Sequence, residues 1–420
     1  MNNFLPLRFL LFLFLLSCSS FPQRETEQIT SIHIVDRNGL TETIHSKERL
    51  KQYEKNNFLN SQPYHKITRT YKKDSLGNTR SCISSYHPNG QAQQYLEALN
   101  SRAYGKYTEW FSNGNLRLKA FVIAGIADLN TLAEESWLFD GNCFVWNEDG
   151  SLEALIRYSK GELQGTSEYY HDKKTLWKSV PYEKGKVHGT VLVFKESGEI
   201  LQKSEFQNGK KTGKTLRFWK VEQIAAEEEF QDDLLLSGKY FDREGKLISS
   251  IANGKGTRVS FGKNFPYEMQ EFQDGEQEGK VQVFDSENNL SQIYHIKNGL
   301  KHGEDLCFYS KSSRPKISIL WHEGMINGTV KTWYKNGILE SQKEISSNKK
   351  NGLSTAWYKN GSVCLIEKYE NDKLIRGEYF QKDNPAPLST ISNGSGESVL
   401  FDSNGNFLRR VSYSDGKPSS

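Results

Sequence analysis

The sequence predicts an all-β fold: an elongated, twisted antiparallel β-meander of hairpin repeats in a single sheet, preceded by one short hairpin and one helix. Aromatic residues recur at a nearly constant spacing, and turn-forming residues follow them at two fixed offsets. The composition agrees, because aromatics make up 12% of the 420 residues and the chain has 34 Gly but only 10 Pro. Many aromatics and many turns in a polar background are typical of thin β-structure.

Residues 1–17 have the pattern of a secretory signal of the lipoprotein type. Arg8 is followed by the apolar run Phe9–Leu16, which is too short to span a bilayer, since a spanning helix needs about 20 residues. The following Ser17 and Cys18 resemble a bacterial lipobox, in which the cysteine is acylated before cleavage. We therefore expect Cys18 to carry palmitate-type chains that hold the protein to a membrane. The alternative is a plain signal peptide with an incidental cysteine.

Residues 18–76 form the predicted N-terminal segment, which is less regular than the rest of the chain. The stretch "SIHIVDRNGLTETIH" predicts a hairpin that turns at Asn38 and Gly39. The stretch "SKERLKQYEKN" places Ser46 as an N-cap before charged helix formers, which predicts one short helix.

Residues 77–418 form the predicted array of about fourteen repeats, recognised by self-similarity. Each repeat has one aromatic residue, here called its marker, about four positions before a turn signal. Successive markers lie 20–25 residues apart, with a single gap of 36. The markers are Tyr86, Trp110, Trp146, Tyr170, Phe194, Phe218, Phe241, Phe261, Phe284, Phe308, Trp333, Trp357, Phe380 and Phe401.

Each repeat carries two turn signals, and a third glycine usually opens the next repeat. The first signal follows the marker, as in Asn336–Gly337 and Asn360–Gly361 of the nearly identical "TWYKNG" and "AWYKNG". The second lies about fifteen residues after the marker, where Asp233, Asn348 and Asp372 replace the usual glycine. Gly, Asn and Asp tolerate the φ > 0 that tight hairpin turns require.

The segments between the turns predict two short strands in each repeat. The second strand starts with an apolar residue six positions after the marker and ends with another near twelve, as Ile200 and Phe206 follow Phe194. An even separation predicts that both residues point to one face of the strand. We expect the markers to form a hydrophobic seam, each covering the next, so that Trp333→Ala costs on the order of 3–5 kcal/mol. An exposed aromatic groove that binds peptide, glycan or lipid is the other interpretation.

Three places interrupt the period. The gap of 36 after Trp110 holds a half-unit insertion, which we expect to extend a hairpin or to add a surface loop. Proline stands near the expected turns in "RPK" at 314–316 and in "NPAP" at 384–387, which predicts a disturbance at an edge or turn.

The repeat is similar to the bacterial variant of the MORN (membrane occupation and recognition nexus) repeat. "GTVKTWYKNGILESQKEISSNKKNG" and "HGTVLVFKESGEILQKSEFQNGKKTG" carry the resemblance, which covers roughly residues 77–418. It implies a twisted antiparallel sheet of hairpins paired side by side, on the order of 130 Å long at about 4.8 Å per strand. Many such proteins are grouped as YwqK-type antitoxins, although only His188 and His302 here keep the His-Gly lead of the repeat.

The sequence predicts no catalytic residues, no cofactor and no metal site. Cys82, Cys143, Cys307 and Cys364 show no metal-ligand spacing, so we expect them to be small, half-buried apolar side chains. "NGKGT" at 253–257 lacks the earlier glycine that a phosphate loop requires. We therefore expect a protein that is not an enzyme and has no small-molecule substrate.

The expected function is that of a non-enzymatic, membrane-anchored repeat lipoprotein, which acts as a protein-interaction or envelope-associated scaffold. Cys18 supplies the lipid, and Ser19 fits sorting to the outer membrane, on the periplasmic face or at the cell surface. The partner is an unidentified protein, since a formal net charge of +4 with 25% charged residues does not indicate nucleic-acid binding. The alternative is an antitoxin-like module that neutralises a toxin or effector protein.

Overall fold

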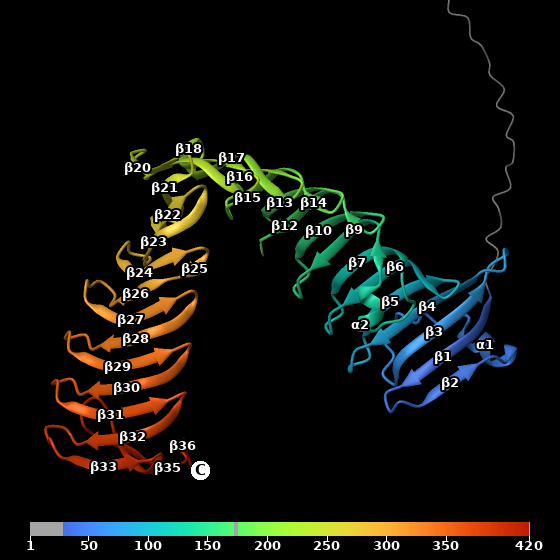
Figure 1. The fold of residues 1–420 in the computed structure, drawn as a ribbon. Helices are drawn as coiled ribbons and strands as arrows, with labels where there is room; N and C mark the ends of the chain where they lie inside the picture. Colours follow the sequence, from blue (N-terminus) through green and yellow to red (C-terminus); the bar gives the residue numbers. More distant parts are fainter. Residues whose placement is uncertain (1–27, 172–174, 420) are drawn as a thin grey trace, which may run out of the picture. The chain divides into compact units, whose positions relative to one another are not determined.

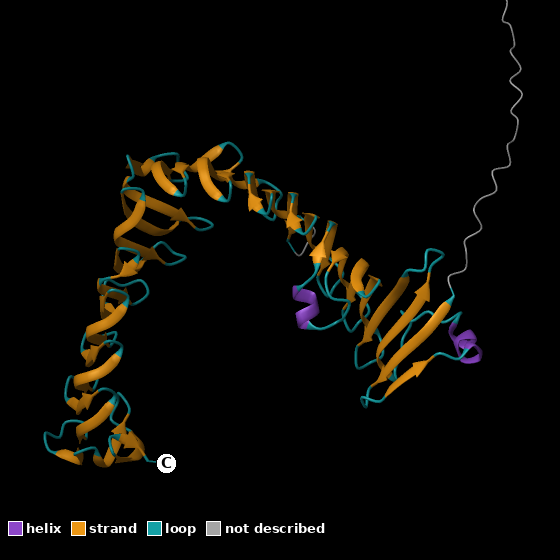
Figure 2. Cartoon of the chain, turned by 45° about the vertical axis from the view of Figure 1, so that its right-hand side comes forward, coloured by secondary structure: helices purple, strands orange, loops and turns teal. Residues whose placement is uncertain are grey.

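The computed structural model describes residues 28–171 and 175–419, and the chain divides into two compact units. The first unit ends at Glu162 and the second begins at Leu163. The described elements are 36 antiparallel strands of one open sheet and two short helices (Figures 1 and 2). The predicted all-β meander is therefore confirmed. Among the described helices, neither has the length and apolar character needed to cross a bilayer.

The first unit starts with the predicted hairpin and helix. β1 (Ile29–Asp36) pairs with β2 (Thr41–Ile44) across a turn in which Gly39 has a φ of 85°. In α1 (Lys47–Tyr53), the Ser46 hydroxyl accepts a hydrogen bond from the backbone N–H of Arg49 at 3.3 Å. Both predictions for this segment are confirmed.

The other strands of the first unit pair mostly in chain order. β1 also pairs with β3, and β7 pairs with both β8 and β9. The strands are β3 (His65–Lys73), β4 (Thr79–Tyr86), β5 (Ala92–Leu99), β6 (Arg102–Trp110), β7 (Leu116–Ala124), β8 (Leu138–Phe139), β9 (Gly141–Trp146) and β10 (Leu152–Ser159), and β11 (Glu162–Leu163) spans the junction between the units.

The second unit continues the meander with two strands to a repeat. Its strands are β12 (Gly165–Tyr170), β13 (Leu176–Glu183), β14 (Lys186–Val187), β15 (Gly189–Phe194), β16 (Ile200–Gln207), β17 (Lys210–Lys220), β18 (Gln223–Gln231), β19 (Leu234–Phe241), β20 (Leu247–Ala252), β21 (Lys255–Phe261), β22 (Pro266–Gln273), β23 (Glu276–Phe284), β24 (Leu290–Lys297), β25 (Leu300–Lys301), β26 (Gly303–Phe308), β27 (Pro315–His322), β28 (Met325–Trp333), β29 (Leu339–Ser346), β30 (Lys349–Trp357), β31 (Val363–Glu370), β32 (Lys373–Phe380), β33 (Pro387–Ser392), β34 (Ser395–Phe401), β35 (Phe407–Ser414) and β36 (Lys417–Pro418). Pro315 and Pro387 each begin a strand, so the two proline-containing stretches lie at turns as predicted.

The two turns of a repeat have different backbone conformations. In the first turn, after Phe194, the Gly198 N–H donates to the Lys195 carbonyl at 2.9 Å, and only the glycine has positive φ. This is a type I turn closed by a left-handed glycine. In the second turn, Asn208 and Gly209 have φ of 52° and 88°, as a two-residue type I′ turn requires. The sequence identified both turns but not this difference.

A β-bulge follows the first turn in every repeat. Thirteen of the fourteen markers pair with the first residue of the next strand, and Phe218 pairs with the second residue, Ile224. The register shifts by one residue directly beside each of these pairs. In one repeat Phe194 pairs with Ile200 and Val193 pairs with Gln202, so Leu201 is the extra residue. The bulge reverses the alternation of side chains. The prediction that Ile200 and Phe206 share a face is therefore wrong.

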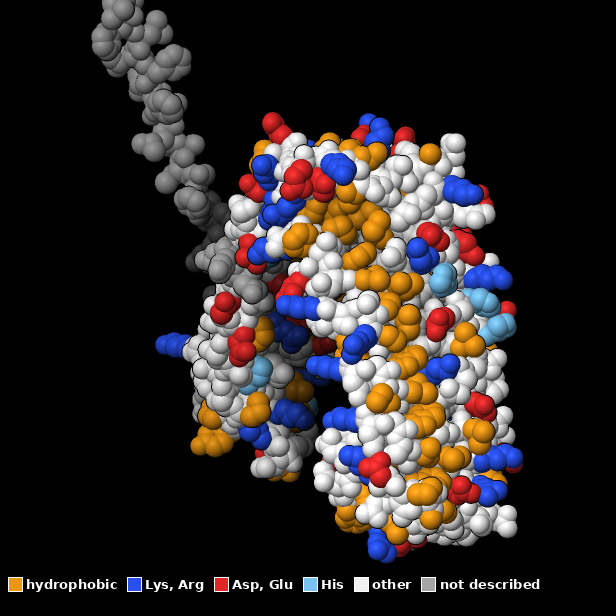
Figure 3. All heavy atoms as spheres, turned by 90° about the vertical axis from the view of Figure 1, so that its left-hand side faces the viewer, with side chains coloured by type: hydrophobic (Ala, Val, Ile, Leu, Met, Phe, Trp, Pro, Cys, Tyr) orange, Lys and Arg blue, Asp and Glu red, His pale blue; other side chains and the backbone are white. Residues whose placement is uncertain are grey.

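Side chains in the second unit divide between the marker face, which holds the markers, and the opposite face. On β28, Trp333 and Lys331 lie on the marker face, whereas Val330 and Thr332 lie on the opposite face, by the alternation along the strand. Most side chains of these strands are only half-buried. Figure 3 shows a band of hydrophobic side chains along one side of this unit. The sheet therefore leaves apolar surface in contact with solvent.

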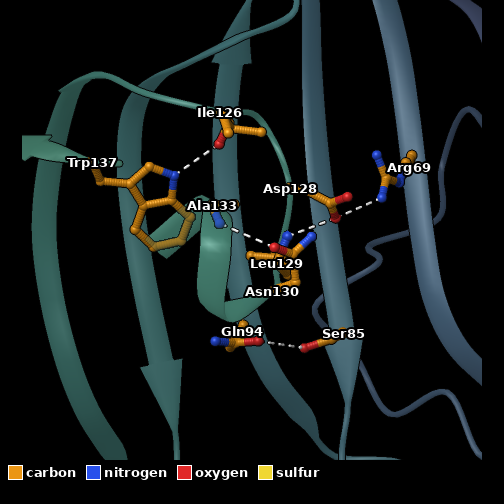
Figure 4. Close-up of polar contacts among 9 residues, drawn as sticks. All are labelled: Arg69, Ser85, Gln94, Ile126, Asp128, Leu129, Asn130, Ala133 and Trp137. Atoms are coloured by element: carbon orange, nitrogen blue, oxygen red, sulfur yellow. Dashed lines mark hydrogen bonds and ion pairs between the residues drawn. The ribbon is translucent and has the colours of Figure 1, made fainter. Parts of the chain in front are cut away.

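The insertion after Trp110 forms a helix, which the sequence did not predict. α2 (Thr131–Glu135) begins at Asn130, whose side-chain oxygen accepts a hydrogen bond from the Ala133 N–H at 3.0 Å (Figure 4). Trp137 is buried and donates from Nε1 to the Ile126 carbonyl at 2.8 Å. The insertion therefore packs against the sheet and contributes to its core, instead of forming a simple surface loop.

Candidate functional site

The predicted lipidation residue and signal lie outside the described residues, so the lipoprotein assignment stays a prediction. The later cysteines Cys82, Cys143, Cys307 and Cys364 are free thiols and are buried or half-buried. Burial raises the pKa of the Cys143 thiol to about 11, which keeps it protonated and unreactive near neutral pH. No cluster of His, Cys, Asp and Glu suited to a metal ion occurs among the described residues.

The markers are mostly half-buried. Tyr86, Phe261 and Phe380 are buried, and the other eleven are intermediate in exposure. Two strands separate successive markers, or roughly 9.6 Å, which exceeds the usual 4.5–7 Å between contacting rings. Each marker instead pairs with a residue at the start of the next strand, as Phe401 does with Phe407, whose ring centroid lies 6.3 Å away. Successive markers are therefore too far apart to stack on one another, contrary to the expectation from the sequence.

The residues around each marker connect one repeat to the next. The Tyr334 hydroxyl donates to the carbonyl of the next marker, Trp357, at 2.7 Å. Asn336 Nδ2 donates to the Lys359 carbonyl in the next first turn at 2.9 Å. Other residues directly after a marker make the same bond to the next marker carbonyl: His87, Trp219, Tyr309 and Tyr358. Lys195 makes a similar bond to the carbonyl of Trp219, which directly follows the next marker. The duplicated "WYKNG" is thus an element that joins repeats.

The second turns make a matching set of bonds on the other edge of the array. Asn348 donates its backbone N–H to the Ile326 carbonyl at 3.0 Å and accepts from the Ile326 N–H at 2.8 Å through Oδ1. Asp372 does the same with Lys350, at 2.9 Å and 2.8 Å. Asn or Asp therefore tolerates the positive φ, as glycine does, and adds a bond to the preceding repeat. Hydrogen bonds between turns hold the repeats together without a second layer of structure.

Two segments of the second unit curl tightly enough to join strands that are not neighbours. In the first curl (residues 217–275), the Leu235 N–H donates to the Gly275 carbonyl at 3.1 Å. In the second curl (residues 356–416), the Leu374 N–H donates to the Gly416 carbonyl at 3.1 Å. Each curl encloses a small hydrophobic core.

Corresponding residues, offset by 139–141 positions, build the two curls. Gly238 and Gly377 each leave room for a tyrosine hydroxyl, since a Cβ would lie 2.6 Å and 2.8 Å from it. The paired positions are Glu228 and Glu367, Leu235 and Leu374, Gly238 and Gly377, Tyr240 and Tyr379, Ile251 and Ile391, Gly256 and Gly396, and Val259 and Val399. This longer repeat was not predicted, although its offset is present in the sequence.

The first curl contains an ion pair whose carboxylate is buried. The Glu228 side chain is 5% exposed and accepts two hydrogen bonds from Arg258, at 2.7 Å and 3.2 Å, and one from the Tyr240 hydroxyl at 3.0 Å. In the second curl the hydroxyls of Tyr369 and Tyr379 bond to Glu367 at 3.0 Å and 2.9 Å. Burial, followed by the nearby carboxylate, raises the pKa of Tyr379.

Each curl also has a groove. The first has a volume of 540 Å³ and is lined by Lys195, Glu196, Ser197, Leu201, Arg217, Phe218, Trp219, Phe261, Gly262 and Lys263. The second has a volume of 460 Å³ and is lined by Ser362, Val363, Ile366, Phe380, Asp383, Asn384 and Pro385. The first groove combines aromatic and cationic side chains, whereas the second is mainly apolar. These grooves are the candidate binding sites of the second unit.

Comparison with known proteins supports the repeat assignment. The sequence model of the MORN repeat variant matches residues 326–345, the repeat that contains Trp333. No curated protein matches the chain. Among 48 matching solved chains is a porin-like protein from Bacteroides uniformis, with 10% sequence identity and a TM-score of 0.16, over 58% of this chain and 95% of that one. This TM-score is too low to support any argument about function.

Proposed function

We propose that this MORN-variant repeat protein is a non-enzymatic lipoprotein, anchored to a membrane through Cys18, and that its sheet binds a partner protein of the cell envelope. The observation that most supports the proposal is that the repeats are joined at their turns, as by Tyr334 and Asn348. Strands joined in this way need no covering layer, so the marker face stays half exposed. Repeat arrays commonly use such extended surfaces for binding.

Site-specific photo-crosslinking in the envelope tests whether the marker face binds a partner. A crosslinker replaces Leu353, which is 50% exposed on the marker face, and in a matched control it replaces Leu300, which is 48% exposed beside a second turn. We expect a discrete adduct from position 353 and none from position 300. Equal adducts from both positions, or none from either, would contradict binding at this face. Recovery of cytoplasmic proteins alone, with the protein in the cytosol, would favour an antitoxin-like role.

Metabolic labelling with a palmitate analogue tests the anchor. The wild type and a Cys364→Ala control are expected to be labelled equally, and Cys18→Ala is expected to lose the label. Cys364 is a suitable control because it is a free, half-buried thiol in the array. Labelling that persists in Cys18→Ala would contradict the proposed lipid anchor. The proposed protein binding would then be tested by crosslinking alone.

A further inference from the structure

The groove of the first curl has a preformed aromatic wall. The rings of Trp219 and Phe261 meet edge to face, with centroids 4.8 Å apart. Trp219 is fixed by its Nε1–H, which donates to the Phe241 carbonyl at 2.9 Å, and Phe261 is buried. A wall fixed in this way receives an apolar side chain without first having to be ordered.

Cationic side chains surround this wall. Arg217 donates from Nη2 to the Phe261 carbonyl at 2.7 Å, one of the five N–H bonds that a guanidinium can make. Lys263 is exposed at the rim of the groove. Burial lowers the pKa of Arg217, so its charge is held in a poorly solvated place where a carboxylate would stabilise it.

The corresponding place in the second curl has the opposite charge. Tyr334, Ala356 and Ser403 stand where the first curl has Lys195, Arg217 and Lys263. Glu340 and Asp402 stand where the first curl has Leu201 and Gly262, and Lys335 stands where it has Glu196, so the net charge is still negative. Burial, followed by the charge of Glu340, raises the pKa of Tyr334 to about 12. The same backbone therefore carries mainly cationic side chains at this position in the first curl and mainly acidic side chains in the second.

We propose that the groove of the first curl binds an acidic peptide segment of the partner protein, with one carboxylate on Arg217 and an adjacent apolar side chain against Trp219 and Phe261. This inference rests on the proposed protein-binding function. A single half-buried guanidinium beside an aromatic wall fits one carboxylate and one side chain. A membrane surface fits less well, because the acidic Glu196 lies exposed on the groove and Glu199 already pairs with Lys195 at 3.0 Å.

Fluorescence anisotropy on the purified full chain tests the inference, with a labelled random copolymer of glutamate and tyrosine as the probe. We expect the probe to bind, and a lysine–tyrosine copolymer not to bind. Lys263→Glu and Arg217→Gln are each expected to weaken binding at least tenfold, whereas Ser403→Glu, at the position corresponding to Lys263, is expected to leave it unchanged. Lys263 is exposed and its charge reversal leaves the buried contacts intact, so the test does not depend on Arg217→Gln folding normally.

The outcomes separate this inference from the proposed function. Binding that is unaffected by Lys263→Glu, or weakened equally by Ser403→Glu, would overturn the inference even if envelope crosslinking succeeds. Probe binding with the expected losses would support it even if no envelope partner is found. Vesicles that contain phosphatidylglycerol are the competing probe. If they bind more tightly than the copolymer and lose binding in the same variants, an anionic lipid surface replaces the peptide.

Discussion

In the first curl Glu228 lies between Arg258 and Tyr240, whereas in the second curl Glu367 lies between Tyr369 and Tyr379. The backbone around the two glutamates is nevertheless the same, down to the hydrogen bond that links non-neighbouring strands in each curl. Position 398, which corresponds to Arg258, is a buried serine. The comparison indicates that glycine and tyrosine positions set the curl, and that the charges around it can change independently.

Replacement of the last marker of each curl is expected to have the largest effect. Phe261 is 4% exposed and packs on Trp219, whereas Phe401 is only half-buried. Phe261→Ala is expected to cost about 4 kcal/mol and Phe401→Ala about 2 kcal/mol, because the cost follows the buried volume removed. Urea denaturation followed by tryptophan fluorescence measures both. Equal losses would mean that the two hydrophobic cores contribute equally to the free energy of unfolding.

Neutralising the carboxylates of Glu228, which is buried, and Glu367, which is half-buried, comes next. Glu228→Gln leaves Arg258 without its counter-charge and is expected to lower the free energy of unfolding by about 3 kcal/mol. Glu367→Gln leaves no unpaired cation and is expected to cost about 1 kcal/mol. Urea denaturation at low and high salt measures the loss of stability in each variant and shows whether the loss depends on charge. The idea that Arg258 causes the difference fails if Glu367→Gln is as costly as Glu228→Gln.

Alanine at the second-turn glycines tests whether the two curls share one geometry. A Cβ on Gly254 or Gly394 would lie 2.5 Å or 2.6 Å from a backbone nitrogen, whereas a Cβ on Gly299 meets nothing within 4 Å. All three glycines have φ of 72–75°, so the backbone strain is matched. Gly254→Ala and Gly394→Ala are each expected to cost about 2 kcal/mol more than Gly299→Ala. Unequal costs in the two curls would show that their turns are packed differently.

The smallest effect concerns the two buried tyrosines at high pH. Burial raises the pKa of Tyr240 and of Tyr379 above the ordinary value of 10.0, and Arg258 opposes the rise only at Tyr240. The neutral phenols therefore favour the folded state below pH 10, and this contribution is lost as the pH rises from 10 towards their folded pKa values. Tyr240→Phe and Tyr379→Phe are each expected to reduce the alkaline loss of stability, and by similar amounts, because both folded pKa values lie above the pH range of the measurement. Denaturation at pH 8 and pH 11 measures it, and a pH dependence that neither substitution changes would contradict the role of the buried phenols.

The regular part of the array was predictable because each repeat is determined locally. The markers, the glycines and residues such as Asn348 and Asp372 recur at fixed offsets, and each imposes a turn or a strand end by its own conformational preference. The hairpin at Gly39 and the helix capped by Ser46 followed from equally local signals.

The errors arose where pairing between strands decides the outcome. The extra residue Leu201 reverses the faces of its strand, and no residue type in the sequence marks it as unpaired. The α2 insertion became part of the core through the burial of Trp137 against the sheet.

The sequence by itself determined the repeat, its turns and its strands, because these depend on interactions within one hairpin. Only the tertiary structure decided which side chains are buried, where the sheet curls, and that Arg217, Trp219 and Phe261 share a groove. Arg217 and Phe261 are 44 positions apart, and they meet because the first curl joins strands that are not neighbours in the sheet. Contacts of this range depend on the accumulated bend of several hairpins, which no single repeat encodes.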